Sequence, residues 1–276
     1  MKLGNEPYCV NPTKNERDAW DRRASVSGCS FKGVLFKSFP ESLNRVLHKF
    51  HVEFISEGLS GVDGNISILD AGCGYGRISA EIRNRFSRPR IFGLDSSWHF
   101  IKSYTGYVPG ITTGIRGDVT DLPFQSESFD AVVIVTCLMY IPSRLRQRVL
   151  REIFRVTREG GMIIVIEPGL IAQRIYSCFG LLDLVNKHSN CMDLNTGGTG
   201  STVRELSQWT KDNDGDILNT YANPGFALIL PLLLVASRFS FKGLLHWLLQ
   251  LSGLLDRILH KKPYLSLHIG LIIRKG

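Results

Sequence analysis

The sequence lacks an uninterrupted apolar run of about 18 residues, the length that a conventional membrane-spanning helix needs. The nearest approach, FALILPLLLVA from Phe226 to Ala236, is shorter and contains Pro231. The first twenty residues also lack the apolar core of a signal peptide. We therefore expect a cytoplasmic protein without a conventional membrane span.

Cysteines at metal-ligand or redox spacing are missing as well. None of the six cysteines forms a C-x-x-C pair, and no histidine lies at a zinc-ligand spacing from them. Scattered cysteines of this kind fit a reducing compartment. We therefore expect no metal site and a cytosolic location.

Acidic residues are outnumbered, with 25 Asp and Glu against 33 Lys and Arg, so the formal net charge is +8. Such a charge favours association with phosphates, nucleic acid or anionic lipid, although many basic proteins bind none of these. The hydrophobic fraction of 43% and charged fraction of 21% are typical of a globular chain and exclude wholesale disorder.

Two patterns divide the chain. Residues 1–64 are polar and then helical, with apolar residues at helical spacing between Leu43 and Ile55, and we expect them to form a helical cap. From 66 to 167 short apolar runs alternate with helical stretches. Strands are expected at ISILDAG, RIFGLDS, GIRGD, FDAVVIVTCL and GMIIVIEP. Strands that are apolar on both faces, alternating with helices, predict an α/β fold with a doubly wound, mainly parallel sheet.

The part after Pro168 contains fewer clear signals. Thr202 and Glu205 have the spacing of a capping box, which predicts a helix directly after them. Two further strands are expected, at DILNTYAN and within PYLSLHIGLIIRKG. We therefore assign 65–276 to one domain that carries an apolar insertion at about 224–262.

A glycine-rich turn follows the first expected strand, in ISILDAGCGYGRISAEI. Gly72, Gly74 and Gly76 give the pattern G-x-G-x-G, and glycines at such a turn let the backbone approach a ligand closely. A dinucleotide fingerprint would have its third glycine at position 77, which is Arg77. The spacing favours a nucleotide-type cofactor other than a dinucleotide.

Two acidic residues end the next two expected strands. Asp95 closes the second strand, where a carboxylate can accept hydrogen bonds from both hydroxyls of a ribose. Asp118 follows the third strand, in RGDVTDLPF, and can accept from an exocyclic adenine amine. Both positions lie at the carboxyl ends of strands, the edge at which open α/β sheets bind ligands.

The motifs ILDAGCGYGR, GLDSS, GDVTDLPFQSESFDAVVIVTCLMYIP and LREIFRVTREGGMIIVIEP occur in this order over roughly 66–168. Together they resemble the class I S-adenosylmethionine-dependent methyltransferases. The resemblance is to the small-molecule, type 11-like branch that includes quinone, sterol and sugar methyltransferases. It implies a Rossmann-like sheet with a reversed final strand, and S-adenosylmethionine as cofactor with S-adenosylhomocysteine as product.

The resemblance also implies roles for individual residues. The loop from Asp70 to Gly76 would cradle the methionine and ribose, Asp95 would bind the ribose hydroxyls, and Asp118 the adenine amine. Ser96 and Val119 would line the adenine faces, and Thr136 would lie near the methionine amine. The full expected cofactor set is Asp70, Ala71, Gly72, Cys73, Gly74, Gly76, Arg77, Asp95, Ser96, Asp118, Val119 and Thr136.

The catalytic residues are less clear, because the loop after the fourth strand, CLMYIP, lacks the histidine that family members often carry there. Methyl transfer needs a base only for a poorly acidic hydroxyl or a protonated amine. The candidates are Tyr140, Glu167 and His188. Glu167, at the end of the fifth strand, could equally be a structural carboxylate.

The insertion at 224–262 is longer than the short connection usual between the last two strands of the family. Polar positions recur every three or four residues within it, and the surface between them is Leu, Ile and Trp. These polar positions are Lys242, His246, Gln250, Gly253, Arg257 and His260. Four interpretations stay open: an ordinary core helix, a lid over an apolar acceptor, a homodimer interface, or a peripheral contact with an anionic membrane through Arg257, Lys261 and Lys262.

Arginines also cluster on the helix expected at 144–157, which we interpret as a solvated outer face. Exposed aromatics do not alternate with them, so nucleic acid is not an expected partner. The working hypothesis is methyl transfer to a small, lipophilic or lipid-linked acceptor. The alternatives are a protein or RNA methyltransferase and a non-catalytic, cofactor-binding partner subunit.

Overall fold

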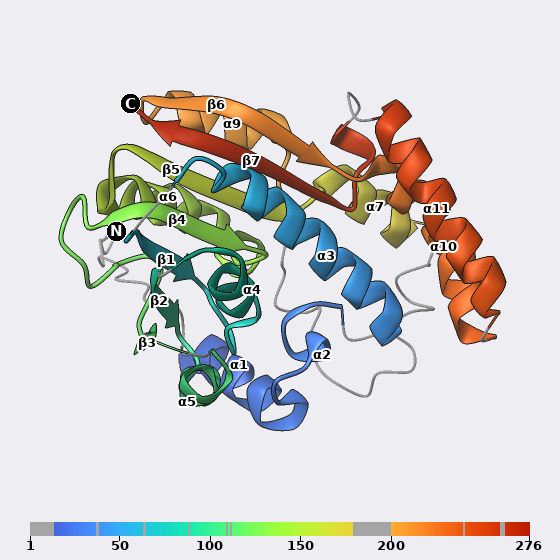
Figure 1. Cartoon of the computed structure of the whole chain (residues 1–276), viewed down its shortest axis with the longest axis horizontal. Coiled ribbons are helices and arrows are strands. Elements are labelled where there is room, and N and C mark those ends of the chain that lie inside the picture. The colour runs from blue at the N-terminus through green and yellow to red at the C-terminus, as the bar shows by residue number, and fades with distance from the viewer. Residues whose placement is uncertain are drawn as a thin grey trace, which may run out of the picture.

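The computed structural model describes residues 14–36, 39–62, 65–87, 89–108, 110, 112–178, 200–239, 241–259 and 263–276. In this part of the chain, seven strands form one sheet in the order β3-β2-β1-β4-β5-β7-β6 (Figure 1). The strands are β1 Ser67–Ala71, β2 Arg90–Asp95, β3 Thr112–Arg116, β4 Phe129–Val135, β5 Thr157–Pro168, β6 Gly215–Ala222 and β7 His268–Lys275.

The first five strands run parallel, whereas β7 pairs antiparallel with both β5 and β6. This is the doubly wound sheet with a reversed final strand that the motifs imply, and the fold prediction is confirmed. Every residue of β1 is buried, as the apolar pattern on both faces predicts for a strand covered by helices.

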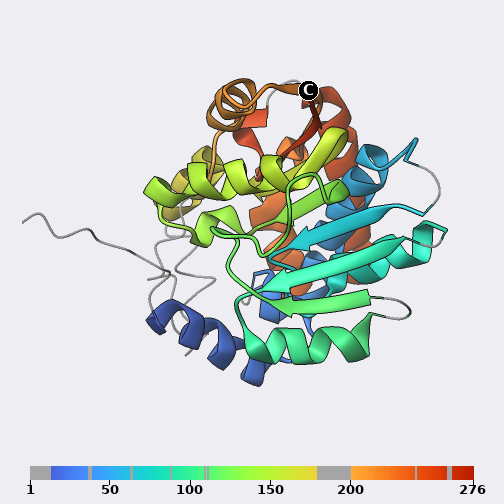
Figure 2. The ribbon, with the colours of Figure 1, turned by 90° about the vertical axis from the view of Figure 1, so that its left-hand side faces the viewer.

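Helices cover both faces of the sheet (Figure 2). Helices α6 and α9 share a buried cluster with one face, and α3 and α4 share a second cluster with the other. The helices of the N-terminal half are α1 Lys14–Ser27, α2 Phe31–Val34, α3 Glu41–Gly58, α4 Arg77–Arg85 and α5 Trp98–Tyr107. Those of the C-terminal half are η1 Leu138–Tyr140, α6 Ser143–Val156, α7 Leu170–Cys178, α9 Val203–Lys211, α10 Pro224–Arg238, α11 Lys242–Leu259 and η3 Pro263–Leu265.

The helix starting near 202 begins as the capping box predicts. The Oγ1 atom of Thr202 accepts a hydrogen bond from the backbone N–H of Glu205 at 3.1 Å, so one of the unpaired donors at the helix N-terminus is satisfied. Most apolar positions of α3 are buried as its spacing predicts, with Leu43 and Leu47 fully inaccessible.

The insertion between β6 and β7 forms two helices, α10 and α11. One side of α10 is in the core, because Phe226 and Leu233 are fully buried in a cluster that also contains Leu43 and Leu47 of α3. The polar stripe predicted for α11 is present, since His246, Gln250 and Arg257 are all exposed. His260 lies outside the described residues. No helix within the described ranges is long and apolar enough to cross a membrane.

Candidate active site

The glycine turn between β1 and α4 has a backbone that other residues rarely adopt. Gly72 has φ +76°, and a Cβ placed there would come within 2.7 Å of the Sγ atom of Cys137. Gly76 has φ +94°, and its Cβ would come within 2.3 Å of Val108. Both positions therefore require glycine, because the left-handed backbone and the lack of space each exclude a side chain. The turn is built so that the backbone itself faces the pocket.

Asp95 joins the second strand to this turn. Its Oδ2 atom accepts from the N–H of Gly74 and its Oδ1 atom from the N–H of Ser97, each at 2.9 Å. The surrounding protein shields the carboxylate of Asp95 from water and thereby raises its pKa to about 6, while the two backbone hydrogen bonds act in the opposite direction. Asp95 also lines the pocket, as the expected contact with a ribose requires.

Asp70 and Arg77 lie on either side of the same turn, and both line the pocket. The Oδ2 atom of Asp70 accepts from the hydroxyl of Ser79 at 2.7 Å, and burial raises the pKa of Asp70 to about 6. Arg77 is buried and donates to the Nδ1 atoms of His48 at 3.1 Å and His51 at 3.3 Å. Burial lowers the pKa of Arg77 to about 10. The pocket wall therefore holds a carboxyl group and a guanidinium close together.

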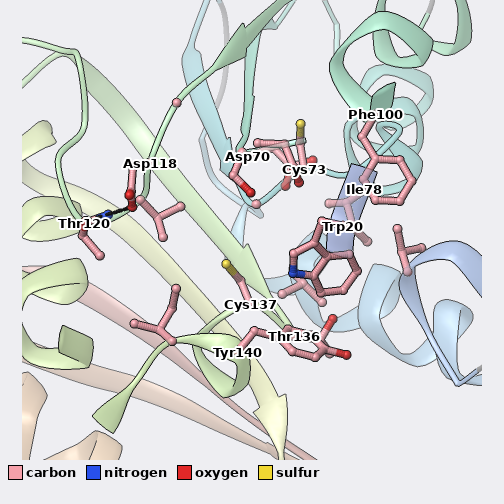
Figure 3. A pocket seen from close by; sticks show the side chains of 18 of the residues that line it. Trp20, Asp70, Cys73, Ile78, Phe100, Asp118, Thr120, Thr136, Cys137 and Tyr140 are labelled. Carbon is pink, nitrogen blue, oxygen red and sulfur yellow. Dashed lines mark hydrogen bonds between the residues drawn. The ribbon is translucent and has the colours of Figure 1, made fainter. Parts of the chain in front are cut away.

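Asp118 lies on the loop that follows β3, across the pocket from Trp20 and Phe100 (Figure 3). Its Oδ1 atom accepts from the N–H and the hydroxyl of Thr120, at 2.9 and 2.8 Å. The Nε atom of Arg148, on α6, donates to the carbonyl of Thr120 at 2.7 Å. These bonds fix the loop so that Asp118 stays at the edge of the pocket.

Thr136 directly follows β4 and has φ +52°, a left-handed conformation that is strained for a β-branched residue. Its N–H donates to the carbonyl of Ile166 in β5 at 2.7 Å. Strained backbone of this kind persists where neighbouring contacts over-determine it, and it is concentrated at functional sites. Here it turns the chain from β4 into the pocket wall.

Glu167 lies under that wall and is inaccessible to solvent. Its carboxylate accepts from the N–H groups of Cys137, Leu138 and Met139 at 2.9, 2.8 and 3.0 Å. Burial raises the pKa of Glu167 to about 7 against the opposing effect of these three donors. The carboxylate thus holds the backbone of η1 in place.

The structure brings most of the predicted site residues together around one pocket. Ala71 ends β1, and Gly74 and Gly76 belong to the turn, but none of the three lines the pocket; Glu167 lies beneath it, and His188 is outside the described residues. The predicted residues that line the pocket are Asp70, Gly72, Cys73, Arg77, Asp95, Ser96, Asp118, Val119, Thr136 and Tyr140.

The sequence predicts a helical cap over 1–64, but it does not show that helix α1 of this segment covers the pocket. Trp20 packs edge-on against Tyr140, with ring centroids 4.7 Å apart. The Oδ1 atom of Asp21 accepts from the hydroxyl of Ser97 at 2.6 Å and from the N–H of His99 at 3.2 Å. A tryptophan in a polar segment was the one available signal, and it does not say which surface the ring meets.

A Rossmann-like sheet, a glycine turn after β1 and acids after β2 and β3, all at one edge, are the arrangement in which open α/β sheets bind nucleoside-type cofactors. Residues 68–161 match the family model described as "Methyltransferase domain". These residues therefore form a class I S-adenosylmethionine-dependent methyltransferase domain, and the family prediction is confirmed.

One sequence relative and two solved structures illustrate the similarity. Sterol 24-C-methyltransferase of Yarrowia lipolytica is 34% identical over 112 residues, which are 39% of this chain and only 29% of that protein. Magnesium protoporphyrin IX methyltransferase of Synechocystis PCC 6803, solved with bound S-adenosylhomocysteine, covers 95% of this chain and 95% of its own, with a TM-score of 0.57 at 13% identity. Geranyl diphosphate methyltransferase, in complex with its diphosphate and sinefungin, covers 86% of this chain and 79% of its own, with a TM-score of 0.57 at 14% identity.

Proposed function

We propose that this protein transfers a methyl group from S-adenosylmethionine to a small, lipophilic acceptor. The observation that carries the proposal is a single pocket in which the glycine turn, Asp95 and Asp118 face a wall of aromatic and aliphatic side chains. The polar side suits a cofactor, and the apolar side suits an acceptor with little polarity.

The residues present fit the cofactor. Gly72 and Cys73 line the pocket and would hold the methionine part, Asp95 would accept from the ribose hydroxyls, and Asp118 from the adenine amine. When bound, S-adenosylmethionine supplies a methyl group on a sulfonium, which is already activated for displacement. The task of the protein is therefore to position the acceptor in line with that methyl group and to exclude water.

The apolar part of the pocket lining supports a lipophilic acceptor. It is formed by Trp20, Phe100, Tyr140, Ile141 and Leu145, and its polar groups are few. The sterol methyltransferase relative acts, by its name, on a lipophilic molecule, although the match covers less than a third of that protein.

We assign the three catalytic candidates different roles within this proposal. Tyr140 lines the pocket, and burial raises the pKa of its phenol, so it would contact the acceptor as a neutral hydroxyl. Glu167 already accepts from three backbone N–H groups, so we assign it as a positioning residue. His188 stays a proposed base.

Calorimetric titration tests the cofactor, and turnover tests the reaction. S-adenosylmethionine should bind and NAD should not. The purified chain should release S-adenosylhomocysteine when it is supplied with sterol or prenyl acceptors dispersed in detergent. Binding of NAD with no heat from S-adenosylmethionine would contradict the proposal. Cofactor binding without turnover, on any acceptor, would favour the non-catalytic partner subunit.

A further inference from the structure

The α10–α11 hairpin exposes an unusual amount of apolar surface. Nine large apolar side chains of this hairpin have exposed fractions between 47% and 64%. They are Leu228, Leu232, Val235, Phe239, Phe241, Leu244, Trp247, Leu254 and Ile258. We call these nine residues the apolar platform. A contiguous exposed patch of this kind marks an interaction surface, whereas scattered single residues do not.

The platform is formed by one stripe on each helix. Leu228, Leu232 and Val235 are spaced by four and three residues, which places them on one face of α10. Leu244, Trp247 and Leu254 likewise share one face of α11, at spacings of three and seven.

The two stripes face the same way. Gly225, at the start of α10, packs on Leu255, near the end of α11, so the helices are antiparallel. Going around each helix axis in the direction in which successive residues advance, the stripe comes first and the face that contacts the other helix comes next. In an antiparallel pair, this places both stripes on one side of the hairpin.

The platform and the cofactor pocket lie at the same edge of the sheet. Strand β6 runs in the same direction as β5, because both are antiparallel to β7. The chain therefore leaves β6 for α10 at the carboxyl edge of the parallel strands, as it leaves β1 for the glycine turn (Figure 1). A surface that covers the platform would lie beside the edge at which the pocket is built.

Charge distinguishes between the surfaces that could cover the platform. Residues 224–262 contain five basic residues and one acid, Asp256, a formal charge of +4. Asp256 accepts from the N–H groups of Gly225 at 2.7 Å and Phe226 at 3.4 Å, so this acid is used inside the hairpin. A second copy would bring +4 against +4, whereas an anionic surface complements this charge. The basic residues are Arg238, Lys242, Arg257, Lys261 and Lys262.

We propose that the apolar platform docks on an anionic lipid surface. Amphipathic helices bind in the membrane interface with apolar residues among the acyl chains and basic residues near the headgroups. Tryptophan favours that depth, and Trp247 lies within the platform. Docking of this kind does not depend on methyl transfer. If the proposed function holds as well, a lipophilic acceptor reaches the pocket from the lipid beside it.

Co-sedimentation with vesicles tests the docking. The full chain should sediment at low salt with phosphatidylcholine vesicles that contain about a third phosphatidylglycerol, and much less with pure phosphatidylcholine. High salt should release it, because screening removes the attraction. The double variant Leu232→Gln/Trp247→Gln should bind at least about tenfold more weakly, since it removes two apolar side chains from the interface. Leu218→Gln on β6, where the leucine is 47% exposed, is the matched control and should bind like the wild type.

Fluorescence gives a second readout that folding defects do not mimic. The emission of Trp247 should shift to the blue on anionic vesicles, and Trp247→Phe should keep binding while losing most of that shift. No sedimentation with anionic vesicles at low salt, equal binding to neutral vesicles, or wild-type binding by the double variant would each overturn the proposal. The proposal would also be overturned if sedimentation velocity shows that the wild type is a dimer that does not bind vesicles and that the double variant is a monomer. Titration with S-adenosylmethionine on the same samples keeps this result separate from the proposed function.

Discussion

The rings of Trp20 and Tyr140 meet edge-on at 4.7 Å and connect the N-terminal helix α1 to η1 on the wall of the pocket. An aromatic pair of this geometry is worth about 0.5–1.5 kcal/mol beyond the area it buries. The contact therefore keeps α1 over the pocket and water out of it.

Trp20→Ala should open this cover. We expect the KM values for S-adenosylmethionine and for the acceptor both to rise about tenfold, because the pocket that the two would share becomes accessible to water. Steady-state kinetics measure the change. Trp98→Ala, which removes a tryptophan that is 52% exposed on α5, should leave KM unchanged. Equal effects of the two variants would mean that Trp20 does not cover the site.

Asp95→Asn should weaken cofactor binding by about 10- to 100-fold, because hydrogen bonds to a charged group are worth about 1.5–3 kcal/mol. The affinity for the cofactor should also depend on pH. The pKa of Asp95 is raised to about 6, so the carboxylate that grips the ribose is present above that pH and is lost below it. Wild-type affinity should fall between pH 7 and 5, and that of the variant should stay nearly flat. Titration calorimetry measures both, with Asp216→Asn on the exposed side of β6 as control.

Glu167→Gln should destabilise the protein by about 1–3 kcal/mol, because the amide oxygen can still accept from the two N–H groups at Oε1, but the NH2 group then faces the N–H of Met139. Chemical denaturation measures the loss, and Glu159→Gln at an exposed position is the control. For a positioning residue, kcat falls while the shape of its pH profile is retained. Loss of one limb of that profile would instead identify Glu167 as the general base.

His268→Gln should change how the free energy of unfolding depends on pH. His268 is buried against His51 at 3.2 Å, and burial lowers its pKa to about 3. In the unfolded chain a histidine binds a proton below about pH 6.5, whereas the folded protein keeps His268 neutral, so this histidine opposes folding increasingly as pH falls from 6.5 toward 3.

As the pH falls from 6.5 toward 3, the free energy of unfolding of His268→Gln should therefore increase relative to that of the wild type by up to about 1.4 kcal/mol per pH unit. Denaturation of both proteins at several pH values measures the difference in free energy of unfolding. His246→Gln, on the exposed side of α11, should run parallel to the wild type. A constant offset between His268→Gln and the wild type would show that His268 titrates normally in the folded protein.

Thr136→Gly should raise the free energy of unfolding by about 1 kcal/mol, because glycine adopts φ +52° without the strain that threonine meets. Thermal melting measures the gain. Thr113→Gly in β3 should instead lower the free energy of unfolding by about 1 kcal/mol, since glycine weakens an ordinary strand. Destabilisation by both variants would mean that the backbone at Thr136 is not strained. Activity should fall in Thr136→Gly, because the pocket wall loses its fixed direction.

The sheet and the glycine turn were predictable because they depend on local pattern. Strands that are apolar on both faces are recognisable from the sequence. Asp95 and Asp118 follow the glycines in the order and at the strand ends where such acids are expected. The cover by α1 was not predictable, because a contact between Trp20 and Tyr140 depends on packing between segments far apart in the sequence. The role of Glu167 is not predictable for the same reason, since its partners are backbone groups that a sequence does not show.

The basic helix α6 shows a further limit of sequence patterns. Its arginines suggest a solvated outer face, yet Arg148 donates to the carbonyl of Thr120, and Arg155 donates to those of Leu122 and Phe124. Spacing along a helix reports which side a residue occupies, but it does not report the loop that this side meets. These arginines stabilise the loop that follows Asp118.

The position of β7 has a consequence for how the chain is made. This strand follows β6 in the sequence but lies between β5 and β6 in the sheet. During synthesis β6 therefore emerges with its edge unpaired, and within the described chain it has no strand to join until residues 268–275 follow. The contact between His51 and His268 spans 217 positions and waits for the same event. The two strands and the hairpin between them should thus enter the fold as one late unit, after the methyltransferase core has formed.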